Sequence, residues 1–255
     1  MSKQLLIYQR AVAVNPRDHK DISVKAGADF EFAKEVNSVP LMAVEFDPAS
    51  IEYPIVFVGD SAGIMPAALL GIRDNENLYV DESGAWNAKY LPAFVRRYPF
   101  VFSSEDGARF TLCLDEEFQG VNQRGVGERL FDAEGQRTQY LQNVLNFLQA
   151  YQAQYDATRA FVQRLNDLGL LEPMQAQFTL RTGQKISLGG FMIVNRARLR
   201  TLSGADLAKL AVSGDLDLVY AHLQSQRNFT PTAERILRVI EPAATTAETA
   251  PNWPA

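Results

Sequence analysis

The feature that most constrains the fold of this 255-residue chain is a long stretch without proline or glycine, from Thr138 to Leu168. Within it, apolar and aromatic residues, with one threonine, recur every three or four positions, the period of one face of an α-helix. They are Leu141, Val144, Leu148, Tyr151, Tyr155, Thr158, Val162 and Leu165. Gly169 follows, and glycine commonly stands just after the last turn of a helix. The pattern predicts one helix over about 138–168.

A heptad spacing of this length allows two interpretations. Either the helix packs against the rest of its own chain, or it forms the interface of a homodimer. Tyrosine and threonine occupy the middle of the stripe, and the polar face is rich in glutamine rather than in paired charges. These features favour packing within the chain and leave a homodimer through helix 138–168 as the alternative.

The residues before that helix have the pattern of short strands separated by turns. Apolar or β-branched runs occupy 4–14, 39–46 and 53–58, and two candidate hairpins pair 69–72 with 78–80 and 99–103 with 109–114. Strands joined by such short links are antiparallel. After the helix, the pattern predicts a hairpin of 177–180 with 185–194, and helices over 204–211 and 215–226.

Together these segments predict an α+β fold in a single domain over 1–240, β-rich over 1–120 and helix-rich over 136–230. The sheet of the N-terminal half is expected to be antiparallel, and closure into a barrel-like form is one shape open to it. The tail 241–255 is rich in alanine, threonine and proline and has no periodicity, so it is expected to be disordered.

Charge and composition exclude several classes of function. The net charge is −5, from 25 basic and 30 acidic residues, which is the wrong sign for a general nucleic-acid binder. One cysteine and two histidines cannot build a disulfide or a cysteine-rich zinc site, and no P-loop is present, so we expect no metal and no cofactor. No apolar run reaches the roughly 18 residues of a membrane span, and none resembles a signal peptide, so we expect a cytoplasmic protein.

The catalytic candidates are weak. Residues 59–63, Gly-Asp-Ser-Ala-Gly, match the nucleophile elbow of α/β-hydrolases, with Ser61 as nucleophile and His222 as the only later histidine. However, only 54 residues precede the expected strand at Ile55, and little room remains for the helix that should follow. A turn between two sheet segments is favoured. Asp115 and Glu116 are possible general bases, but a solvated acidic turn explains them more simply.

The segment from Trp86 to Phe100 is the leading candidate for a ligand site. Prolines at 92 and 99 bracket a short helix that carries two adjacent arginines. The candidate residues are Trp86, Tyr90, Arg96, Arg97 and Tyr98. Guanidinium groups beside flat aromatic rings can hold a carboxylate, a phosphate or a peptide backbone. In the alternative interpretation, the aromatic rings fill the core and the arginines pair with Asp81 or with residues 115–117.

Several segments, taken in order, resemble the bacterial SapC family, over about residues 35–230. The most specific is Tyr90-Leu-Pro-Ala-Phe-Val-Arg-Arg-Tyr-Pro-Phe100, and the others are Asn77–Asp81, Cys113–Glu116, Leu130–Gly135 and Gly214–Ser225. The family is named after a protein linked to surface-layer expression and has no catalytic motif. Its members are often encoded beside TonB-dependent receptors and halogenase-like proteins. The resemblance therefore implies uptake or modification of an external nutrient or peptide, and assigns no role to any residue.

We therefore expect a non-catalytic binding or accessory protein in a nutrient-uptake or cell-surface system. It would recognise a peptide, a protein or a small anionic ligand near Trp86–Phe100. The alternative is an enzyme, a hydrolase or one that modifies a peptide or nutrient, using Ser61 or the carboxylates of Asp115 and Glu116.

Overall fold

The computed structural model describes residues 6–27, 29–60, 63–104, 109–179 and 185–240. The strands are β1 (Ala11–Ala13), β2 (Ser23–Val24), β3 (Ser38–Pro40), β4 (Ile55–Asp60), β5 (Gly63–Leu69), β6 (Phe100–Ser103), β7 (Thr111–Asp115), β8 (Val121–Asn122), β9 (Glu128–Arg129), β10 (Leu171–Thr179) and β11 (Lys185–Val194). The helices are α1 (Pro16–His19), α2 (Phe46–Ser50), α3 (Ala93–Arg96), α4 (Gln139–Asp167), α5 (Arg196–Arg200), α6 (Gly204–Val212), α7 (Asp215–Ser225) and α8 (Phe229–Ile240), with 3-10 turns η2 (Glu31–Ala33), η3 (Ala43–Glu45) and η4 (Gln226–Asn228).

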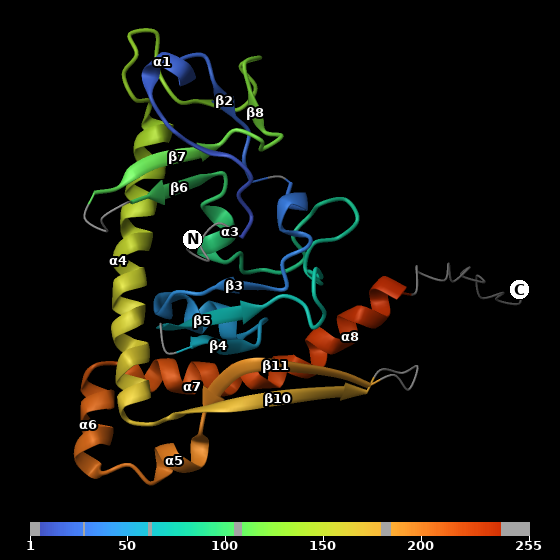
Figure 1. Cartoon of the computed structure of the whole chain (residues 1–255), viewed down its shortest axis with the longest axis vertical. Helices are drawn as coiled ribbons and strands as arrows, with labels where there is room; N and C mark the ends of the chain where they lie inside the picture. The colour runs from blue at the N-terminus through green and yellow to red at the C-terminus, as the bar shows by residue number, and fades with distance from the viewer. Residues whose placement is uncertain (1–5, 28, 61–62, 105–108, 180–184, 241–255) are drawn as a thin grey trace, which may run out of the picture.

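Helix α4 runs along one side of the molecule, and the three sheets follow one another along its length (Figure 1). Its first turn is capped by Thr138, whose hydroxyl oxygen accepts a hydrogen bond from the backbone N–H of Leu141. After its last turn Gly169 adopts a left-handed conformation, with φ of 59°. The next N–H, that of Leu170, then bonds the carbonyl of Leu165 at 2.9 Å. The predicted long helix and its glycine stop are confirmed.

The heptad stripe of α4 packs within its own chain. Six of its eight residues are buried, and the other two, Val144 and Tyr155, are half-buried. Thr158, the polar member, has a structural task. Its hydroxyl accepts from the N–H of Ala43 at 2.9 Å and donates to the carbonyl of Gln154 at 2.6 Å, which fixes η3 against the helix. A homodimer through helix 138–168 stays a prediction, and it would have to use another face of α4.

All the described strands pair antiparallel, in three separate sheets. Their strand orders are β10-β11-β4-β5-β3, β1-β7-β6 and β8-β2-β9. The antiparallel α+β fold is confirmed, but none of these sheets closes, so the barrel-like form is not adopted. The strands of the first 24 residues and of 121–129 have only two or three residues, which is too short to continue one sheet around a closed barrel.

Two segments before α4 differ from the pattern expected of them. The apolar run 39–46 is a strand only as far as Pro40 and then becomes helical in η3 and α2. A hydrogen bond explains this change from strand to helix: the carboxylate of Glu45 accepts from the N–H of Met42 at 2.8 Å and caps the turn. The expected hairpin of 69–72 with 78–80 is a loop, joined by a bond of 2.8 Å from the N–H of Leu78 to the carbonyl of Leu70.

The largest core cluster lies between the five-stranded sheet, α4 and the C-terminal helices. Phe46 of α2 meets Phe57 of β4 and Phe161 of α4 there, and the ring centroid of Phe46 lies 6.5 Å from that of Phe57 and 5.9 Å from that of Phe161. Helix α7 covers α2 and two strands of this sheet. Among the described residues, no helix is both long enough and apolar enough to cross a bilayer. The tail 241–255 lies outside the described residues.

Candidate ligand-binding groove

A buried carboxylate positions the short helix α3. Glu45 accepts hydrogen bonds at 2.7 Å from both the hydroxyl of Tyr90 and the N–H of Ala93, the first residue of α3. Because the side chain of Glu45 also caps η3, one carboxylate joins two segments that are far apart in sequence, 42–45 and 90–93. The N-terminus of a helix favours such a negative group. This bond network sets the position from which Arg96 and Arg97 leave α3.

A groove of about 420 Å³ lies between α3, the N-terminal half of α4 and the segment around residues 26–32. Its wall is rich in aromatic residues: Phe30, Phe32, Tyr98, Phe100, Phe118, Tyr140 and Phe147. Phe32 and Tyr98 are stacked with ring centroids 4.0 Å apart, and Phe118 meets Tyr98 edge-on at 5.1 Å. The volume is in the range of pockets that hold small molecules, and an apolar wall with few polar groups is typical of them.

The polar groups of this groove are hydrogen-bond donors. Arg96 is exposed, and its guanidinium lies 5.5 Å from the centre of the Phe147 ring. It hydrogen-bonds the side chain of Tyr90, and it forms no ion pair with any described residue. Asn143 of α4 lines the same groove, and its side-chain oxygen already accepts a bond of 2.8 Å from Gln139. Its amide NH₂ group is therefore the part left to donate. Such a pair favours a ligand with acceptor oxygens.

Arg97 differs from its neighbour because it is buried. Its guanidinium lies 4.4 Å from the ring centre of Phe94, 4.8 Å from that of Tyr151 and 5.7 Å from that of Tyr8. Burial raises the pKa of Tyr8 to about 12, although Arg97 acts in the opposite direction. The hydroxyl of Tyr8 donates to the carbonyl of Phe100 at 2.7 Å. Arg97 thus forms part of the groove floor, held among aromatic rings.

Trp86 and Tyr90 support the groove without lining it. The indole N–H of Trp86 donates to the hydroxyl of Tyr53 at 3.0 Å, and its ring meets Phe30 edge-on at 5.8 Å. Tyr90 is held by Glu45. Of the five residues proposed from the sequence, Arg96, Arg97 and Tyr98 therefore lie at one groove, and the other two hold the segment behind it.

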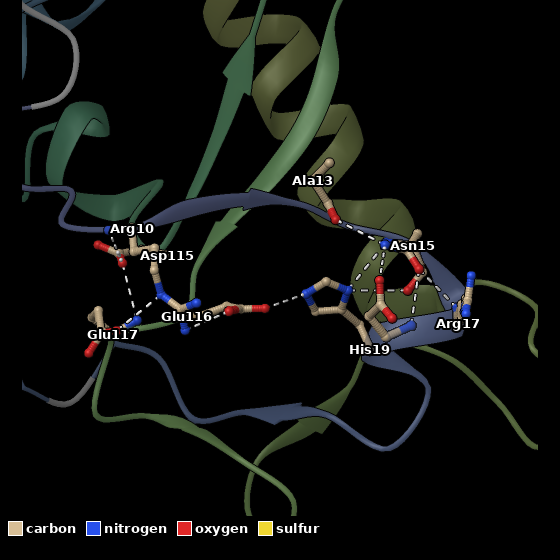
Figure 2. Close-up of polar contacts among 9 residues, drawn as sticks. Arg10, Ala13, Asn15, Arg17, His19, Asp115, Glu116 and Glu117 are labelled. Carbon is tan, nitrogen blue, oxygen red and sulfur yellow. Dashed lines mark hydrogen bonds and ion pairs between the residues drawn. The ribbon is translucent and has the colours of Figure 1, made fainter.

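The acidic candidates lie outside this groove and are engaged by donors. Asp115 is fully buried and accepts from the N–H of Gln9 at 2.8 Å, the N–H of Arg10 at 3.0 Å and the hydroxyl of Tyr98 at 3.2 Å. Figure 2 shows Glu116 between Arg10 and His19, at 2.7 and 3.2 Å. These carboxylates join the start of β1 and α1 to the end of β7. Either one would have to release a donor before it could act as a base.

Ser61 lies outside the described residues, but the residues on either side of it are informative. Asp60 pairs with Gly63 in an antiparallel hairpin, so a strand follows where a nucleophile elbow needs a helix. Gly59 has a φ of 137°, and a Cβ there would collide with the carbonyl oxygen of Gly63. The hairpin backbone therefore accounts for the first glycine of the motif.

His222 lies in the core, on the inner side of α7. Its Nε2 accepts from the N–H of Val194 at 3.0 Å, and its ring centre is 4.9 Å from that of Phe57. Burial penalises the imidazolium and lowers the pKa of His222 to about 3. The ring is neutral at physiological pH.

The α4 side of the groove was not predicted from the sequence. Tyr140 and Phe147 are seven residues apart on one side of the heptad stripe, and that widening of the stripe is the signal that could have found them. Asn143 gave no signal of its own. Within the described ranges, no three histidine, cysteine, aspartate or glutamate side chains converge as metal ligands would.

Comparison with known proteins gives one match. The model of the SapC family matches residues 14–231, which include α3, α4 and the aromatic wall of the groove. Neither the search of curated proteins nor that of solved structures finds a match. Because the matched region spans most of the 255 residues, the chain belongs to the SapC family.

Proposed function

We propose that this chain is a non-catalytic binding protein and that the groove between α3 and α4 holds a small molecule with an apolar body and an anionic head group. The observation that carries the proposal is the position of Arg96. Its guanidinium hydrogen-bonds the side chain of Tyr90 but forms no ion pair with a described residue, and it stands at an aromatic groove, where an anionic ligand would supply the opposite charge.

Two kinds of interaction would contribute to binding. Burial of the apolar body against the aromatic wall is worth roughly 25 cal/mol per Å² of apolar surface removed from water. The head group would accept charge-assisted hydrogen bonds from Arg96 and a further bond from the amide of Asn143. Because Arg96 is exposed, the anion would stay close to solvent and lose little of its hydration.

The groove itself favours binding over proton transfer. Burial raises the pKa of Tyr140 to about 12 and also raises the pKa of Tyr98, so both phenols stay protonated at neutral pH. Asp115 and Glu116 do not line the groove, and both already accept hydrogen bonds or ion pairs, in the case of Asp115 from the hydroxyl of Tyr98 as well. Within this proposal, the protein carries or senses an amphipathic anion in a nutrient-uptake or cell-surface system.

Isothermal titration calorimetry with decanoate tests the proposal, with decanamide as the uncharged analogue. Arg96→Met keeps the aliphatic stem and removes the charge, and we expect it to weaken decanoate binding by about tenfold or more. The matched control is Arg124→Met, because Arg124 is exposed and its side chain makes no contact with the groove. Decanamide is expected to bind weakly to wild type and to be insensitive to Arg96→Met.

A second variant tests the apolar body. Val144 is half-buried in the groove wall, and Val144→Trp would fill the space that the ligand needs. With native circular dichroism retained, this variant should lose decanoate binding. Undiminished binding in both Arg96→Met and Val144→Trp would refute the proposal.

A further inference from the structure

A second groove, of about 720 Å³, lies beside the C-terminal half of α4. The helix forms one side, and the end of the β4–β5 hairpin and Met192 of β11 form the other. No residue that lines it also lines the groove between α3 and α4. We propose that this second groove binds a free α-amino acid with an apolar side chain. The inference goes beyond the function proposed above and does not depend on it.

The charges that line this groove are the reason for the proposal. Asp156 and Arg159 are exposed, opposite in charge and three residues apart on α4, a spacing at which such side chains usually meet. Three other pairs at this spacing in the chain do form ion pairs, at 2.9, 3.4 and 3.0 Å: Glu31–Lys34, Arg73–Glu76 and Asp206–Lys209. Asp156 and Arg159 pair neither with each other nor with any other described residue. Among the residues that the structure describes, one groove therefore offers an anion and a cation that both lack an ion-pair partner.

The spacing of these two residues suits a compact ligand. Residues three apart on a helix have Cβ atoms only about 5–6 Å apart, so a ligand whose two charges are close together can meet both side chains. In an α-amino acid the ammonium and the carboxylate are attached to the same carbon, whereas even a dipeptide separates them by a further residue. Asp156 would accept from the ammonium, and Arg159 would donate two parallel hydrogen bonds to the carboxylate.

The rest of the groove is mixed, with Gln163 and Asn166 on its polar side. Ile64, Val162 and Met192 offer an apolar surface for the side chain of the ligand, and the flexible thioether of methionine adapts to side chains of different shape. Ala160 also lines the groove, and its small side chain leaves space beside the charged residues of the helix. Ser61 and Ala62 lie outside the described residues, and the proposed site does not include them.

Calorimetric titration of the wild-type chain with L-leucine is the experiment that tests this site. Leucinamide lacks the carboxylate and 4-methylpentanoate lacks the ammonium, so each should bind about tenfold or more weakly than leucine. Asp156→Asn and Arg159→Gln should each weaken leucine binding by a similar factor. Asp74→Asn and Arg124→Gln are the matched controls, since both residues are exposed and lie outside this groove.

A loss of binding in these variants can be told apart from a loss of folding, because Asp156 and Arg159 are exposed and their substitution leaves the core intact. Weaker leucine binding in both variants, with normal binding in both controls, supports the site. An absence of saturable leucine binding by wild type would overturn the proposal. Equal binding of leucine and its two analogues, or leucine affinity unchanged in Asp156→Asn and Arg159→Gln, would overturn it as well. Decanoate binding at the first groove should be the same in all four variants.

Discussion

The buried imidazole of His222 makes the stability of the protein depend on pH in a way that can be calculated. Its pKa is lowered from an ordinary value of about 6.5 to about 3 because burial penalises the charged form. Below pH 6.5 the unfolded chain therefore binds a proton at this residue that the folded chain does not, and stability falls as the pH falls. For these two pKa values, the loss between pH 7 and pH 5 is about 2 kcal/mol.

Urea unfolding at pH 7 and pH 5 measures this loss. His222→Gln removes the titrating ring but keeps an oxygen that can accept from the N–H of Val194, so the variant should fold. Subtracting the pH dependence of the variant from that of wild type cancels the contributions of all other titratable groups. The remaining difference should be about 2 kcal/mol, with wild type the more sensitive to acid.

An NMR titration of the histidine rings gives an independent check. The signal that disappears in His222→Gln identifies the residue, and it should not titrate between pH 5 and pH 8. Titration of that signal between pH 6 and pH 7, or a difference in unfolding free energy near zero, would refute the assignment of a neutral core histidine. Either result would restore His222 as a candidate general base.

Two further predictions concern the core. Leu165→Ala, in the buried stripe of α4, should lower the free energy of unfolding in urea by about 2–5 kcal/mol, whereas Gln149→Ala on the exposed face should change it by less than about 0.5 kcal/mol. Burial raises the pKa of the Cys113 thiol, so it should react with Ellman's reagent at pH 8 only in urea, and rapid reaction of the native protein would contradict its place in the core.

The elements that follow from local sequence were predicted closely. The helix expected over 138–168 is α4, because an uninterrupted apolar period and a final glycine are both local signals. The hairpin of β6 with β7 and that of β10 with β11 lie where turns separate β-branched runs. Helices α6 and α7 begin directly after Ser203 and Gly214, as expected.

The contacts that join distant segments could not be predicted from local patterns. Strand β11 pairs with β4 across more than a hundred residues, through Met192 and Phe57, and no local pattern fixes such a pairing. Helix α8 was missed because Pro231 discourages a helical assignment, although proline is tolerated in the first turn. The residues of 39–46 alone do not show that Glu45 will turn its carboxylate onto a neighbouring backbone N–H.

One side of the candidate groove could be predicted from a local sequence cluster, and the other side could not. Arg96 and Tyr98 could be found because two arginines beside aromatic residues form a local cluster with recognisable chemistry. Tyr140 and Phe147, the facing wall, come from more than forty residues later, and the heptad period that predicted their helix also explained them as core residues. Because α4 runs past all three sheets, it places side chains beside each of them. The length of α4, which constrained the architecture, therefore also explains why it forms one wall of both grooves.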